Sequence, residues 1–130
     1  MLKIMVPEII EKIRDQKYVE ALVNLVGLMY YLHENVRIYS GDEILSVTLA
    51  HDALSDTLSV MNNTNASSDS FNYVAEYCAH LAILRLQEVL GDKVAGRAAK
   101  SMSLGLESII TLNKKRGDQD KRSSNENFLL

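Results

Sequence analysis

The sequence predicts an all-α fold: an antiparallel bundle of four main helices, with a short helix before it and a disordered C-terminal tail after it. Two observations support this class. Apolar residues recur every three or four positions along most of the chain, which is the period of a helix with one buried face. The 130 residues are 47% hydrophobic but include only one proline and six glycines, too few turn formers for an all-β fold. One domain is expected, with residues 1–115 forming the bundle.

The first two helices are expected at residues 7–15 and 17–35. Pro7 fits the first turn of a helix, where its missing N–H costs little. The second helix is apolar on two faces, which is typical of a helix central in its bundle or buried between subunits. We interpret its second face as a self-association surface, formed by Val19, Val23, Val26 and Tyr30.

The third helix, expected at residues 40–62, has the clearest start signal. Ser40 and Glu43 have the spacing of a capping box, in which two side chains each accept a hydrogen bond from the other residue's backbone N–H. The inward face of this helix is expected to consist of Ile44, Val47, His51, Leu54, Leu58 and Met61. A polar loop at 62–70 follows, and Gly91 is placed to end the next helix. The last two helices are expected at 71–90 and 92–115.

Charge is distributed unevenly along the chain. No Lys or Arg occurs between Arg37 and Arg85, although the net charge of the whole chain is only −3. The third helix therefore offers an acidic face, which is either simply solvated or a docking surface for a basic protein partner. The residues of this face are Asp42, Glu43, Asp52 and Asp56.

The C-terminal tail, residues 116–130, is polar and is expected to be flexible. It ends in three apolar residues, Phe128, Leu129 and Leu130. These residues either fold back onto the bundle or dock into a partner's groove. Basic residues at 114–116 and 121–122 leave open a nucleic-acid accessory role through the tail, whereas the acidic middle of the chain makes such a role unlikely for the folded core.

Known catalytic signatures are missing from the sequence, including phosphate-binding glycine loops and paired Cys-x-x-Cys motifs. The leading hypothesis is therefore a non-enzymatic interaction module without a cofactor, acting as an adaptor, regulator or assembly factor. The competing hypothesis is an enzyme or a bundle that binds a small molecule or a metal. Glu76 and His80 share a helix face and, together with His51, are its candidate ligands.

Compartment is indicated by the single cysteine and by the lengths of the apolar segments. Cys78 has no second cysteine to pair with, so a reducing compartment is the default. The longest uncharged apolar segment, residues 21–32, is too short to cross a bilayer, which needs about twenty residues. The first twelve residues lack the apolar run of a signal peptide. We expect a soluble, cytoplasmic protein with no membrane partner.

Overall fold

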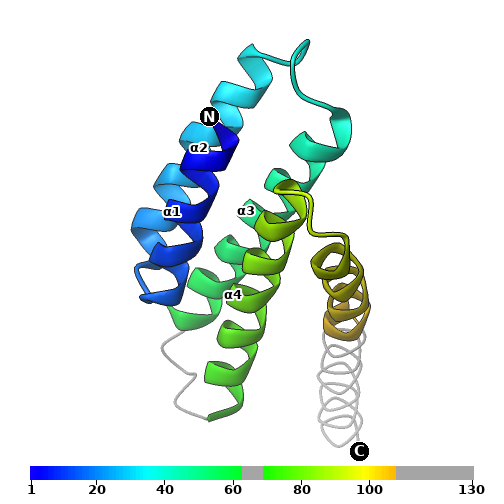
Figure 1. The fold of residues 1–130 in the computed structure, drawn as a ribbon. Helices are drawn as coiled ribbons and strands as arrows, with labels where there is room; N and C mark the ends of the chain where they lie inside the picture. Colours follow the sequence, from blue (N-terminus) through cyan, green and yellow to red (C-terminus); the bar gives the residue numbers. More distant parts are fainter. Residues whose placement is uncertain (63–68, 108–130) are drawn as a thin grey trace, which may run out of the picture. The chain divides into compact units, whose positions relative to one another are not determined.

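The computed structural model describes residues 1–62 and 69–107, and all regular structure in these ranges is helical (Figure 1). The predicted all-α class is therefore confirmed. The four labelled helices are α1 (Leu2–Arg14), α2 (Tyr18–Glu34), α3 (Gly41–Met61) and α4 (Asp69–Val89). A further helix covers residues 93–107.

Two compact units make up the chain, residues 1–99 and residues 100–130, and their boundary falls within the last helix. The first unit contains α1 to α4, which form a ring of antiparallel neighbours (Figure 1). In this ring α1 packs on α2 and α4, and α3 also packs on α2 and α4. Each of the four helices thus has two neighbours, and one of its faces points away from the ring.

The first helix begins earlier than the sequence analysis predicts, at Leu2 rather than at residue 7. Pro7 therefore lies in the second turn and not in the first. The longer helix brings two additional apolar side chains, Leu2 and Val6, into the core. Their burial favours extending the helix through a proline that removes one backbone hydrogen bond.

The start of α3 and the end of α4 agree with the sequence signals. Glu43 N donates to Ser40 Oγ at 3.2 Å and Ser40 N donates to Glu43 Oε1 at 3.1 Å, which completes the predicted capping box. Gly91 has a φ of 100°, a conformation that glycine tolerates best. The N–H groups of Gly91 and Asp92 donate to the carbonyls of Glu88 and Gln87, forming a Schellman motif.

The most extensive contact in the ring is between α3 and α4. Small residues line both sides of it, so the two helix axes can approach closely. Thr57 Oγ1 lies 3.2 Å from the carbonyl oxygens of both Ala53 and Ala75, one on each helix. The buried small residues of this contact are Ser46, Ala50, Ala53 and Thr57 on α3, and Ala75, Cys78, Ala79 and Ala82 on α4.

The predicted inward face of α3 is therefore wrong in part. Val47 and Leu54 are buried as predicted, but Met61 is 55% exposed and Ile44 and Leu58 are only half-buried. The helix is rotated so that its alanines face α4. Within the described ranges, none of the helices is long and apolar enough to cross a membrane.

Candidate interaction surfaces

A row of apolar side chains on α2 is exposed to solvent. The exposed fractions are 64% for Val19, 65% for Val23, 37% for Val26 and 70% for Tyr30. The opposite face of α2 is buried in the ring through Ala21, Leu25, Leu28 and Leu32. We call the four exposed residues the α2 seam, because their spacing of four, three and four is that of a coiled-coil contact.

Open grooves lie on both sides of the α2 seam. The groove toward α1 has a volume of about 350 Å³ and is lined by Met5, Glu8, Ile9, Lys12, Val23, Asn24 and Gly27. The groove toward α3 has a volume of about 250 Å³ and is lined by Val26, Met29, Tyr30, His33 and His51. The seam thus forms a ridge between two depressions, which is the surface relief that packed helices use.

The acidic residues of α3 do not form one continuous surface. Asp52 and Asp56 are both exposed and lie one helical turn apart on the same face. The Asp56 carboxyl is nevertheless partly desolvated by its neighbours, and this partial burial, followed by the charge of Asp52, raises the pKa of Asp56 above its ordinary value. Asp42 is exposed at the start of the helix, while the Glu43 side chain is engaged in the cap. Only Asp52 and Asp56 therefore concentrate negative charge in one place.

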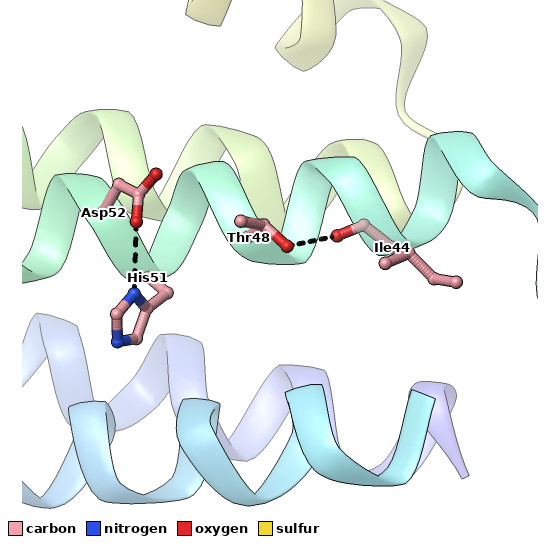
Figure 2. A network of polar contacts seen from close by, with 4 residues as sticks. All are labelled: Ile44, Thr48, His51 and Asp52. Atoms are coloured by element: carbon pink, nitrogen blue, oxygen red, sulfur yellow. Dashed lines mark hydrogen bonds and ion pairs between the residues drawn. The ribbon is translucent and has the colours of Figure 1, made fainter. Parts of the chain in front are cut away.

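His51 is half-buried on the side of α3 that faces α2. Figure 2 shows its ring projecting toward the neighbouring α2, with Nδ1 turned to the carboxylate of Asp52. The distance from His51 Nδ1 to Asp52 Oδ1 is 3.2 Å. Nearby, Thr48 Oγ1 donates to the carbonyl of Ile44 at 2.8 Å, so that its hydroxyl is satisfied within the helix (Figure 2).

Glu76 and His80 are both exposed on α4. In the part of the chain that the structure describes, no three His, Cys, Asp or Glu side chains are grouped so as to hold a metal ion. The structure therefore does not gather His51, Glu76 and His80 into one site. The histidine that shares a groove with His51 is His33, which the sequence analysis did not single out.

Cys78 is buried in the contact between α3 and α4. Burial, with a further contribution from Asp56, raises the pKa of its thiol to about 11. The reactive thiolate is therefore scarce at neutral pH.

A polar cluster around Glu88 was not predicted from the sequence. Glu88 Oε1 accepts hydrogen bonds from Ser46 Oγ of α3 at 2.6 Å and from Arg85 Nη1 at 3.3 Å. Arg85 is only 8% exposed, and Gly96 of the last helix packs against the Glu88 side chain. We call Ser46, Arg85, Glu88 and Gly96 the Glu88 cluster. Its one sequence signal is the three-residue spacing of Arg85 and Glu88, an ordinary pattern on helix surfaces.

The predicted docking residues of the tail, Phe128, Leu129 and Leu130, lie outside the described residues, as does all of 116–130. The described ranges thus define an all-α helical-bundle protein with an uncovered apolar face on α2. Comparison with known proteins adds no relative, since no family model, curated protein or solved structure matches the chain.

Proposed function

We propose that this chain is a non-enzymatic interaction module that associates with a second copy of itself through the α2 seam. The observation that carries the proposal is the exposure of four apolar side chains in one row at coiled-coil spacing. Complete burial of a large apolar side chain stabilises a contact by about 1.5–3 kcal/mol. Burial of the four side chains of the α2 seam would therefore strongly favour association.

A second copy is the occupant that fits this surface best. In a two-fold symmetric contact the same surface serves both partners, so it must be complementary to itself. A ridge flanked by grooves meets that requirement, because the ridge of each copy can enter a groove of the other. The raised pKa of the Cys78 thiol also supports a role other than thiol catalysis.

Substitution of Val23 by Asp tests the proposal directly. Val23 is 65% exposed, so Val23→Asp is expected to leave the protomer folded while placing a charge in the middle of the contact. The variant should elute as a monomer in size-exclusion chromatography with light scattering and retain the helical circular dichroism of the parent.

Leu45→Asp is the matched control, because Leu45 is an apolar residue of α3 that is 55% exposed and lies outside the α2 seam. This control should keep the oligomeric state of the parent. Equal loss of association in both variants would contradict the assignment to α2.

The module has a second surface for which we propose a basic protein partner. It consists of Asp52 and Asp56. Of the four acidic residues predicted for this surface, these two lie together on one exposed face. The support is the placement of two carboxylates one helical turn apart on an exposed face, where a partner's cation would relieve their mutual repulsion. Binding of this kind weakens as salt concentration rises.

A further inference from the structure

The two grooves beside the α2 seam differ in polarity. The groove toward α1 includes Glu8, Lys12 and Asn24 in its lining. The groove toward α3 has neither acidic residues nor Lys or Arg in its described lining, which consists of Val26, Met29, Tyr30, His33 and His51. Because covering a charged group removes its hydration, the apolar seam of a second copy fits the groove toward α3 better. A two-fold contact then covers this groove in both copies.

His33 and His51 are the residues of this groove that can become charged near neutral pH. Histidine is the side chain whose charge ordinarily changes between about pH 5 and 8. His33 is exposed and continues the spacing of the α2 seam, three residues beyond Tyr30. His51 projects from α3 toward α2 (Figure 2). A second copy seated in the groove therefore covers both imidazoles.

Only His51 has a carboxylate placed to neutralise its imidazolium form. Asp52 Oδ1 lies 3.2 Å from His51 Nδ1. Glu34 follows His33 directly, but consecutive residues of a helix do not face each other, and among the described residues no ion pair joins His33 to a carboxylate. The helices packed against α2 and α3 add no other charge to the described lining, since the charged residues of α1 line the other groove and α4 contributes no lining residue. When both histidines are protonated, the groove therefore carries an uncompensated positive charge.

We propose that self-association through the α2 seam depends on pH through the histidines of this groove, and that mildly acidic solution releases the second copy. The inference rests on the proposed function, because the groove is covered only in the associated state. Neutral imidazoles can be covered by apolar side chains, whereas covering an uncompensated imidazolium removes its hydration. Each copy brings the same excess charge to a symmetric contact, so the two copies also repel each other. The separated protomers thus bind more protons than the associated ones, and association weakens as pH falls.

Light scattering of the full-length chain across dilution series at about pH 7.5 and about pH 5.5 tests the proposal. The dissociation constant for self-association should be about tenfold or more higher at the lower pH, because the uncompensated charge must be desolvated on association. Helical circular dichroism at both pH values separates dissociation from unfolding. A protein that is monomeric at both pH values would contradict self-association, and the pH proposal with it. An oligomer with the same dissociation constant at both pH values would overturn the pH proposal alone.

Three variants, each compared with itself at the two pH values, assign the effect to the groove. His33→Asn removes the uncompensated charge and should reduce the ratio of the two dissociation constants to about twofold or less. Asp52→Asn removes the counter-charge of His51 and should raise the ratio above that of the parent. His80→Asn is the control, because His80 is exposed on α4 outside the groove, and it should keep the ratio of the parent. A ratio that is unchanged in His33→Asn, or that falls equally in His80→Asn, would overturn the proposal.

Discussion

At the scale of single residues, Glu88 is where α3, α4 and the last helix of the first unit meet. Its carboxylate accepts from Ser46 and from the buried Arg85, while Gly96 packs against its side chain. A Cβ at position 96 would overlap the Glu88 carboxylate and would lie 2.9 Å from Glu88 Cδ. Gly96 therefore leaves room for the Glu88 side chain in the position where it meets Ser46 and Arg85, even though glycine is a poor helix former.

Gly96→Ala is accordingly expected to destabilise the protein. The substitution gains about 1 kcal/mol of helix propensity, but it must displace Glu88 and weaken bonds to Ser46 and Arg85. Breaking such a buried polar pairing costs about 1–3 kcal/mol, so the net loss should be near 1 kcal/mol in urea unfolding.

Gly27→Ala is the control for Gly96→Ala. Gly27 lies within α2, and a Cβ there would have no atom within 4 Å. This substitution should stabilise the chain by up to about 1 kcal/mol. If Gly96→Ala were equally stabilising, the role assigned to the Glu88 cluster would be wrong.

The pKa of Asp56 predicts how stability depends on pH. Because this pKa is raised in the folded chain, the folded state holds the proton more tightly than the unfolded state does. The contribution of Asp56 to stability is therefore most favourable below the ordinary pKa of 3.8 and is lost as pH rises through the raised value. Asp56→Asn should unfold at a higher temperature than the parent at pH 7, with the difference shrinking at about pH 3. A constant difference at both pH values would contradict the assigned cause.

Some residue-level features follow from the sequence and others do not. The capping box of Ser40 and Glu43 and the terminating Gly91 depend only on neighbours along the chain, so local spacing predicts them. The burial of Arg85 and the sharing of one groove by His33 and His51 depend on which helices become neighbours. Sequence spacing alone does not supply that information.

At the scale of helices, the period of the apolar residues predicts where each helix lies more reliably than which face it buries. The predicted inward face of α3 favoured large side chains such as Met61, but the structure turns Ala50 and Ala53 toward α4 instead. Close approach of two helices lets many small contacts form at once, and their sum outweighs the burial of a few larger side chains. A pattern based on large apolar residues does not identify a face made of alanines as the buried face.

The close contact between α3 and α4 predicts that a larger side chain is not tolerated there. Ala50 is completely buried, so Ala50→Leu should destabilise the fold by about 1–3 kcal/mol through overpacking. Ser59→Leu, at an exposed position of the same helix, should change stability by less than about 0.5 kcal/mol. Urea unfolding monitored by circular dichroism measures both. Similar values for the two variants would mean that the contact is looser than the structure indicates.

At the scale of the whole molecule, the ring of four helices explains why α2 keeps an apolar face in solvent. The ring gives α2 two neighbours, α1 and α3, and buries its Leu25, Leu28 and Leu32. The second apolar face identified in the sequence has no partner among the described residues of the protomer. Its exposure was foreseeable from the excess of apolar residues on α2, whereas the grooves beside it arise only once α1 and α3 are packed.

The mass of the protein in solution tests the central claim, self-association through α2, most directly. The chain has a mass of 14.6 kDa. Light scattering across a dilution series from the micromolar range upward should give about twice this mass or more, falling toward the protomer mass only on dilution. A constant mass of 14.6 kDa at every concentration would contradict the account, because the α2 seam would then remain exposed without a partner of its own kind.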